Sequence, residues 1–248
     1  MSTLTSNLDL RNILFFDIET VSEYQNYTEM PEHFQKLWTI KAKNLSRELE
    51  LDKDQSAHWY NSKAGIFAEF SKVVCISMGY LRKENDAWVL RLKSISGHEE
   101  LELLKEFSQV LDKNYDHADK SLICGHNIKE FDVPFLCRRM VKHNLPLPAI
   151  LDVAGKKPWE IKQFLDTLEL WKFGDMKNFT SLNLLAAVLD VPTPKDDIDG
   201  SMVGQVYWEE NDLDRIAVYC QKDVATVVQV LFRLSGMPIL SPDQIQIL

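Results

Sequence analysis

The chemically most informative residues of the sequence are two acids, Asp17 and Glu19, in the apolar segment 13–20. This segment is rich in β-forming side chains and predicts a buried strand. Because strand side chains alternate between faces, the two acids would project side by side. Two close carboxylates repel each other and are costly to bury, so we expect a cation with them, and hard oxygen ligands suit Mg²⁺ or Mn²⁺. The alternative is an edge strand with two solvated acids.

A third acid, Asp132, lies in the motif Asn127-Ile128-Lys129-Glu130-Phe131-Asp132. Its position after a predicted strand and at the start of a predicted helix places it at the edge of a sheet, where binding sites form. A plain helix cap is the competing interpretation, because Asp is a preferred N-cap residue.

Tyr219 and Asp223 form a second candidate pair on the predicted helix 212–234. Residues four apart share a helix face, so the phenol and the carboxylate could converge on one point. Alone, this spacing is common by chance and carries little weight.

Taken in order, these motifs resemble those of a known family. Asp-x-Glu on a first strand, Asn-x-x-x-Phe-Asp at a helix start and Tyr-x-x-x-Asp on a late helix resemble the DEDD superfamily of 3′–5′ exonucleases, in its tyrosine type. The resemblance is closest to the proofreading exonuclease domains of family B DNA polymerases and their stand-alone relatives. It extends from Ile13 to about Leu234, with the segment 21–63 least matched, and it implies a ribonuclease-H-like fold.

By this resemblance Asp17, Glu19, Asp132 and Asp223 would bind two divalent ions, Mg²⁺ or Mn²⁺, and Tyr219 would orient the attacking water. Two ions roughly 4 Å apart can lower the pKa of a water and stabilise the departing 3′ oxygen. Since tyrosine has a reference pKa of about 10, Tyr219 is a poor general base, and we assign it to hydrogen bonding and positioning.

Substrate contacts are expected at Asn127, Phe131, Ile18 and Thr20. A structural loop role for Asn127 and core packing for Phe131 are the alternatives. Several basic side chains could meet phosphates, although a solvated face is the more common explanation of such charges in the segment 21–63. These are Lys36, Lys41, Lys43, Arg47, Arg138, Arg139 and Lys142.

Four other polar residues receive weaker interpretations. His126 does not match the histidine-type motif of the superfamily, whose place on the last helix is taken by Tyr219, so we interpret it as a loop residue. Asp166 is interpreted as an ordinary strand-end acid rather than a supporting carboxylate. Lys195 and Ser201, in the loop before the last helix, could line the substrate path.

Hydrophobic periodicity predicts an α/β fold with a mixed central sheet and helices on both of its faces. The segment 145–162 reads as loop that could hold one strand, and 241–248 as a tail. We expect one domain, 1–248, with an insertion at about 22–63 that shapes the substrate entrance. The predicted strands are 13–20, 73–81, 87–92, 121–125 and 163–168, and the predicted helices are 97–111, 131–143, 182–189 and 212–234.

Composition narrows the class of protein. A net charge of −9 argues against non-specific coating of nucleic acid, which depends on phosphate neutralisation, but not against an enzyme that grips one strand end. The four cysteines lack the spacing of a zinc or disulfide framework. No apolar run approaches the roughly 20 residues of a membrane helix, and the first ten residues lack a signal-peptide core, so a cytoplasmic protein is expected.

The predicted function is a metal-dependent 3′–5′ exonuclease that removes nucleoside monophosphates from single-stranded DNA ends. The alternatives are the same chemistry on RNA and a non-catalytic nucleic-acid-binding module of the same fold. The predicted partners are a single-stranded 3′ end and replication or repair proteins, none of which the sequence identifies. The physiological pathway, the oligomeric state and the choice of metal are not predicted.

Overall fold

The computed structural model describes residues 8–47, 50–116, 120–192 and 198–248. Its centre is a six-stranded sheet with the order β5-β4-β1-β2-β3-β6. β2 is antiparallel to β1 and β3, whereas the other neighbouring strands are parallel, so the sheet is mixed as predicted. The strands are β1 Ile13–Ser22, β2 Ser71–Glu84, β3 Ala87–Ser96, β4 Leu122–Gly125, β5 Phe164–Asp166 and β6 Ile245–Ile247.

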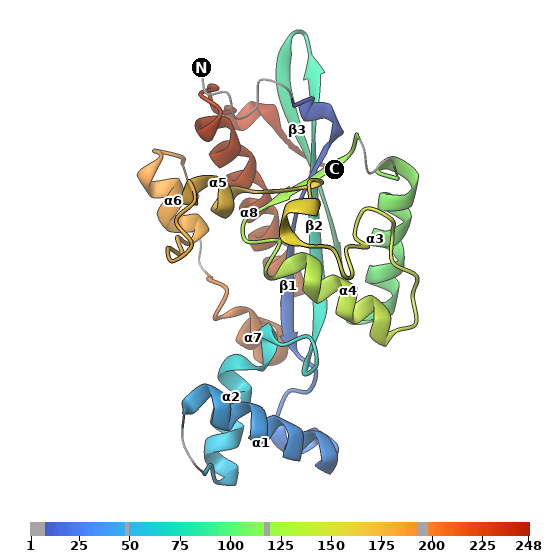
Figure 1. The fold of residues 1–248 in the computed structure, drawn as a ribbon, viewed down its shortest axis with the longest axis vertical. Helices are drawn as coiled ribbons and strands as arrows, with labels where there is room; N and C mark the ends of the chain where they lie inside the picture. The colour runs from blue at the N-terminus through green and yellow to red at the C-terminus, as the bar shows by residue number, and fades with distance from the viewer. Residues whose placement is uncertain (1–7, 48–49, 117–119, 193–197) are drawn as a thin grey trace.

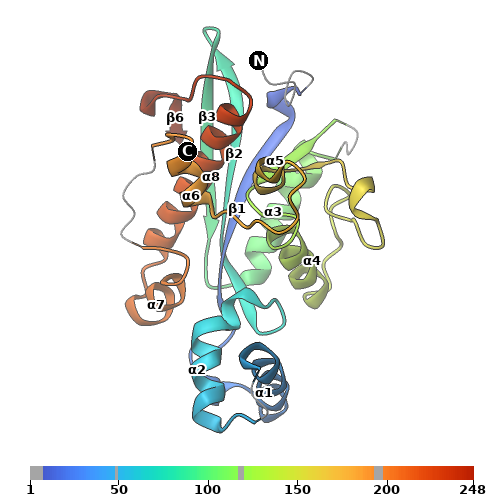
Figure 2. The ribbon, with the colours of Figure 1, turned by 60° about the vertical axis from the view of Figure 1, so that its left-hand side comes forward.

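Helices cover both faces of this sheet, with α3 and α4 on one face and α8 on the other (Figures 1 and 2). The longer helices are α1 Glu32–Ser46, α2 Lys53–Lys63, α3 Glu100–Asn114, α4 Asp132–Lys142 and α8 Leu213–Leu234. Shorter ones are α5 Thr167–Lys172, α6 Leu182–Val188 and α7 Val203–Gln205, which continues into a π-helical turn at Val206–Glu210.

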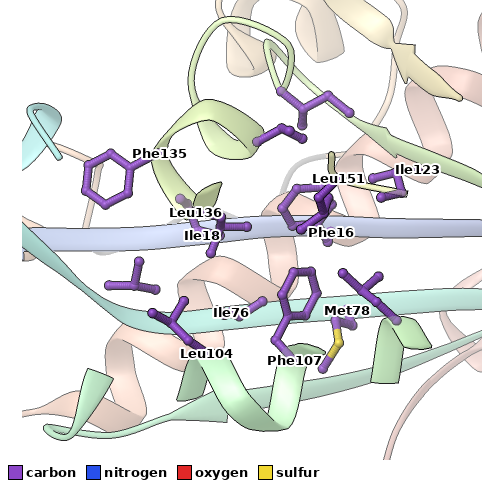
Figure 3. Close-up of a cluster of buried hydrophobic side chains, with 14 of the residues drawn as sticks. Phe16, Ile18, Ile76, Met78, Leu104, Phe107, Ile123, Phe135, Leu136 and Leu151 are labelled. Atoms are coloured by element: carbon purple, nitrogen blue, oxygen red, sulfur yellow. The ribbon is translucent and has the colours of Figure 1, made fainter. Parts of the chain in front are cut away.

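The alternation of side chains along β1 divides the core into two layers. Leu14, Phe16 and Ile18 point into the cluster shared with α3 and α4. Phe16 meets Phe107 of α3 at a ring-centroid distance of 5.7 Å (Figure 3). Phe15, one residue away, points into the opposite cluster with α8. The odd-numbered residues of β1 therefore face α8, and this rule determines where the acids of β1 lie.

The segment predicted as an insertion contains two helices, α1 and α2, that project beyond one end of the sheet (Figures 1 and 2). They have a hydrophobic cluster of their own, built around the fully buried Trp38 and Tyr60. The indole Nε1 of Trp38 donates to the carbonyl of Ser56 at 2.9 Å, which joins the two helices. The amide of Tyr24 donates to the Tyr60 hydroxyl at 3.1 Å, which joins the pair to the chain leaving β1.

Two expectations about irregular segments differ from the structure. The predicted tail contains β6, whose Ile245–Ile247 pair in parallel with β3. The buried amide of Gln229 explains this return of the chain, because it donates to the carbonyl of Leu240 and accepts from its N–H, both at 2.8 Å. The segment 145–162 contains no strand among its residues, all of which are described, and has only a short 3₁₀ turn at Pro158–Glu160.

Two general features of the chain bear on its class. None of the helices in the described ranges combines the length and apolarity needed to span a membrane. All four cysteines are free thiols; three are buried, and Cys137 is partly exposed.

Candidate active site

Asp17 and Glu19 lie where β1 loses one of its neighbours. Among the described residues, β4 pairs with β1 no further than Phe15, which leaves that edge of β1 to the loop that follows β4. The register of β1 against β2 shifts between Glu19 and Thr20, and bulges of this kind re-aim side chains beside functional sites. Both acids project on the α8 side of the strand, as the alternation predicted.

The helix α8 places Tyr219 and Asp223 on the same side. The Tyr219 hydroxyl donates a hydrogen bond to the Asp223 carboxylate, as their four-residue spacing allowed. Cys220, one residue further, donates its thiol to the backbone oxygen and to Oδ2 of Asp17, both at 3.4 Å. One ligand atom each from Asp17, Glu19 and Cys220 lie within 4.8 Å of one another, so the strand and the helix meet at the acids.

Asp132 reaches the same point from α4. It is the first residue of that helix, and Phe131 holds the N-cap position, so the expected cap lies one residue earlier than predicted. The Asp132 carboxylate accepts hydrogen bonds from its own amide and from the backbone N–H of Ile18. This second bond joins the start of α4 to β1 between Asp17 and Glu19.

The loop 126–131 before Asp132 is held by a second buried carboxylate. Asp166, the last residue of β5, accepts hydrogen bonds from the backbone N–H groups of Asn127 at 2.9 Å and Lys129 at 3.1 Å. It also accepts from the N–H of Leu168 at 2.9 Å. A carboxylate that satisfies several amides in a loop fixes the path of that loop. Asp166 therefore has a positioning role, and its interpretation as an ordinary strand-end acid is wrong.

Gly125 permits the sharp departure of this loop from β4. A Cβ at this position would lie 2.1 Å from Cγ2 of Ile128 and 2.9 Å from the carbonyl oxygen of Phe16. Because Ile128 is fully buried and the Phe16 oxygen belongs to the backbone of β1, neither can retreat easily. The loop that carries Asp132 can therefore approach β1 only beside a glycine.

Burial and neighbouring carboxylates raise the pKa values of Asp17, Glu19 and Asp132. Desolvation is the largest cause for Asp17, followed by the negative charges of Asp132, Glu19 and Asp223, and it holds the Asp17 pKa well above its ordinary value. The pKa of Glu19 is raised in the same way, first by desolvation and next by Asp223. Desolvation raises the pKa of Asp132 to about 7, although hydrogen bonds from backbone amides oppose it. The cluster therefore holds excess negative charge in a poorly hydrated place.

These residues fit a divalent cation. Among the groups that shift the pKa values of Asp17, Glu19 and Asp132, none is a described lysine or arginine. Carboxylates gathered at one poorly hydrated point are stable only if they are protonated, meet a cationic side chain or bind a metal. Several carboxylate oxygens make up the donor set that Mg²⁺ and Mn²⁺ prefer.

A cavity of about 380 Å³ lies beside Glu19. One wall is the end of β1, a second is the end of α2 with the turn after it, and a third is the loop before α7. Gly200 of this loop is close to the cluster, because a Cβ built there would lie 3.9 Å from the Tyr219 hydroxyl. The lining residues are Ile18, Glu19, Thr20, Val21, Ser22, Asn61, Ser62, Lys63, Gly65, Ile66, Phe131, Gly200, Ser201 and Gly204.

Both outer walls of this cavity are hydrogen-bonded to the end of β1. The Thr20 hydroxyl donates to the carbonyl of Gly65 at 2.7 Å, which holds the turn after α2. Nε1 of Trp208, in the π-helical turn, donates to the Ser22 hydroxyl at 3.1 Å, which holds the segment around α7. Single π-helical turns are frequent at functional sites, where they adjust the aim of a helix. The cavity is therefore a built feature rather than a gap between mobile segments.

Comparison with known protein families gives one match. Residues 66–238 match the family model described as a predicted 3′–5′ exonuclease related to the exonuclease domain of PolB. The chain belongs to this family. No curated protein matches the sequence.

A solved structure of a longer protein contains a similar fold as one part of its chain. The family B DNA polymerase from the hyperthermophilic archaeon Pyrobaculum calidifontis is similar over 89% of this chain, with a TM-score of 0.52 and 16% sequence identity. The match covers 24% of the polymerase, so this chain corresponds to about a quarter of its length. At this sequence identity the similarity is evidence for the fold alone. It supports the ribonuclease-H-like α/β fold predicted from the sequence.

The four expected substrate-contact residues have different surroundings. Ile18, Thr20 and Phe131 line the cavity. Phe131 also packs against Phe135, with ring centroids 5.4 Å apart, so it serves the core as well as the cavity wall. Asn127 has a left-handed backbone conformation with φ of 64°, which asparagine tolerates. Its backbone N–H donates to the Asp166 carboxylate. Asn127 therefore has a clear structural role in the loop.

The predicted phosphate contact at Arg139 is wrong. Arg139 is 1% exposed, and its guanidinium donates to Glu100, to Glu23 and to the carbonyl of Ala68. Lys142 binds Glu23 at 2.9 Å. The cations of α4 therefore lie on two sides of the helix. Of Arg138, Arg139 and Lys142, Arg138 is the one that is exposed and has no ion pair to a described residue.

Three other sequence interpretations have clear outcomes. His126 is a structural loop residue, as interpreted: its Nδ1 lies 3.0 Å from the Thr167 hydroxyl and its Nε2 lies 2.8 Å from the carbonyl of Thr180. Ser201 lines the cavity, and its hydroxyl donates to Asp199. Lys195 lies outside the described residues.

Sequence reasoning missed the residues that complete the cavity and the acidic cluster. Cys220 follows Tyr219 directly, so its contact with Asp17 could have been inferred from the helix that carries the tyrosine. Gly65 and Lys63 gave no signal, because their role depends on how α2 packs against the end of β1. Only the three-dimensional structure shows that these residues border the acids.

Proposed function

We propose that the protein is a metal-dependent exonuclease that hydrolyses the terminal phosphodiester at the 3′ end of single-stranded DNA and releases nucleoside monophosphates. The observation that supports this best is the convergence of Asp17, Glu19, Asp132 and Asp223 with Tyr219 beside a cavity. The family to which the chain belongs is described by the same reaction class.

The four carboxylates would hold two divalent ions, Mg²⁺ or Mn²⁺. Bound there, such ions lower the pKa of the attacking water and stabilise the charge on the departing 3′ oxygen. The contribution of the chain is to hold the carboxylates at fixed positions. β1 presents two of them, α8 presents a third, and the Asp166-bound loop presents Asp132. The fixed geometry limits the reorganisation that charge development would otherwise require.

Tyr219 orients the attacking water through its hydroxyl and does not act as a base. Desolvation, followed by the negative charges of Asp223, Glu19 and Asp17, raises the pKa of Tyr219 far above that of free tyrosine. The phenol therefore keeps its proton at neutral pH and donates it in a hydrogen bond to Asp223, which leaves the lone pairs of the hydroxyl oxygen to accept a hydrogen bond from the water. Its closeness to Gly200 places this hydroxyl at the edge of the cavity.

The cavity beside Glu19 is where the 3′-terminal nucleotide would bind. It offers apolar contact at Ile18, Ile66 and Phe131, and polar groups at Asn61 and Ser201. The carboxylates at one side would hold the metals on the scissile phosphate. The segment 22–63, through the end of α2, would shape the entrance to this cavity.

The deciding experiment is a degradation assay with 5′-labelled single-stranded DNA and with RNA of the same sequence. Each strand is incubated with Mg²⁺, with Mn²⁺ and with EDTA, beside the Asp17→Ala variant. We expect a ladder that shortens from the 3′ end, requires metal and disappears in the variant. Faster loss of the RNA would assign the enzyme to exoribonucleases. Absence of cleavage by folded protein under both metals would leave a binding module of the same fold.

Tyr219→Phe tests the positioning role of the phenol. We expect kcat to fall by about 10²-fold, the order of magnitude of the loss when a reacting group is slightly misplaced. Metal-induced thermal stabilisation should persist, because the four carboxylates are unchanged. Tyr115→Phe is the matched control, since Tyr115 is a buried tyrosine at the end of α3, in the core shared with α4. A Tyr219→Phe enzyme with normal kcat would contradict the assignment.

A further inference from the structure

We propose that the single strand leaving the cavity binds along α1 and α2, over a surface formed by Lys63, Ile66, Phe67 and Lys41. We call this surface the helical ledge. Its ligand is the stretch of single-stranded polynucleotide on the 5′ side of the terminal nucleotide. The inference rests on the proposed function, because it takes the cavity as the place of the 3′ end.

The ledge begins at the rim of the cavity. Lys63, the last residue of α2, and Ile66, in the turn after it, both line the cavity. Ile66 is 55% exposed, which is unusual for a large apolar side chain beside a polar site. Of the described residues that line the cavity, Glu19 and Lys63 are the charged ones, and they come from different walls. A strand held by metals at the acids would meet Lys63 with its backbone phosphates.

The ledge continues from the turn after α2 onto α1. Nζ of Lys41 lies 4.3 Å from the centre of the Phe67 ring. Phe67 directly follows the exposed Ile66 in the chain. Lys41 is flanked on the same helix face by Leu37 and Leu45, four residues before and after it. These leucines are 52% and 37% exposed. This face of α1 therefore meets the turn after α2 at Phe67, and exposed apolar side chains lie on both sides of Lys41 along the helix.

This combination of cations and exposed apolar side chains fits a single-stranded nucleic acid better than other ligands. Proteins that bind single strands combine cations for the phosphates with apolar or aromatic surface for the bases. In a protein with a net charge of −9, attraction for a polyanion has to come from local cations such as these. Lys36 of α1 differs, because it is already paired with Glu32 at 2.7 Å.

The ledge is fixed relative to the acids. The bond from Thr20 to Gly65 ties the turn between Lys63 and Phe67 to β1, one residue after Glu19. The separate core of α1 and α2 keeps Lys41 over this turn. A strand bound on the ledge would therefore deliver its 3′ end to the carboxylates in a constant register, which is a positional advantage for hydrolysis.

Fluorescence anisotropy tests the ledge without requiring catalysis. A 5′-labelled single strand of about 12 nucleotides, within the range of known site sizes, is titrated with the full-length protein in EDTA over a series of NaCl concentrations. We expect the double variant Lys41→Gln/Lys63→Gln to weaken binding by about 10-fold near physiological salt. Its salt slope should fall by about 1.4, because each lost phosphate contact removes about 0.7 on single strands. Lys36→Gln is the matched control and should bind like the wild type.

The outcomes separate this inference from the proposed reaction. Weaker binding and a lower salt slope in the double variant support the ledge even if the cleavage assay shows no hydrolysis. Unchanged binding in the double variant, with an unchanged melting temperature, overturns the ledge while a 3′–5′ ladder would still support the exonuclease. An equal loss of binding in Lys36→Gln would show that the effect comes from the overall charge of the protein. This result would also overturn the ledge. Failure of the wild type to bind either DNA or RNA overturns it as well.

Discussion

Asp17→Asn should abolish exonuclease activity and, in the same protein, raise stability in the absence of metal. We expect cleavage to fall by about 10³-fold, since the change removes a ligand from a site whose function is to stabilise developing charge. In EDTA at pH 8 the variant should melt at a higher temperature than the wild type. The physical reason is that desolvation and three neighbouring carboxyls already oppose the Asp17 charge.

Metal dependence of the melting temperature provides the second half of this test. A ligand present at about 100 times its dissociation constant stabilises the folded state by about 2.7 kcal/mol. The wild type should gain stability of this order with Mn²⁺, whereas Asp17→Asn should gain little. Asp112→Asn, an exposed acid on α3, is the control and should behave like the wild type. Equal metal stabilisation in all three proteins would show that Asp17 is not a ligand.

This pairing of effects distinguishes a metal site from a structural acid. If Asp17 were simply solvated, its replacement by asparagine would change neither stability nor metal response. If it were a structural hydrogen-bond acceptor, for instance for the thiol of Cys220, its replacement would lower stability in EDTA. A rise in stability without metal and a loss with metal is expected only when carboxylates are held close together for a cation.

Local sequence patterns predicted the strand and helix that carry the reactive groups, because their signals are periodic. β1 is a long apolar strand, and Asp17 and Glu19 stand out in it as charges where burial is expected. Tyr219 and Asp223 lie on a 22-residue helix whose length makes it easy to predict from the sequence. The alternation of two and the spacing of four paired the side chains within each element, and the resemblance to the exonuclease superfamily predicted that the two pairs meet.

Residues that depend on non-local packing were not predictable in this way. Asp166 binds the loop before Asp132 only because β5 lies beside β4, a pairing between segments about 40 residues apart. β6 forms because Gln229 holds the chain after α8, which no local propensity in 241–248 indicates. Arg139 shows the same limit, since a charge on an amphipathic helix is assigned to solvent unless its buried partner is known.

Arg139→Met should cause the largest loss of stability of any single substitution considered for this protein. The guanidinium binds Glu100 through Nε at 2.8 Å and Nη2 at 2.6 Å, and it also binds Glu23 at 2.8 Å. Desolvation alone would raise the pKa of Glu100, but the hydrogen bond and charge of Arg139 outweigh it and hold that pKa below its ordinary value. Removing the guanidinium leaves a buried carboxylate whose remaining partners are the Val73 amide at 2.8 Å and the His143 ring at 2.7 Å.

We therefore expect Arg139→Met to lower the free energy of unfolding by about 3–5 kcal/mol at neutral pH, measured by urea denaturation. Arg138→Met is the matched control on the exposed side of the same helix and should change it by no more than about 0.5 kcal/mol. The difference from the wild type should narrow as the pH falls, because protonation neutralises the Glu100 carboxylate that has lost its guanidinium partner. Adding Glu100→Gln should recover part of the loss, since no buried charge then remains. An Arg139→Met protein as stable as Arg138→Met would show that the network contributes nothing, and the connection between the end of β1 and α4 would then depend on apolar packing alone.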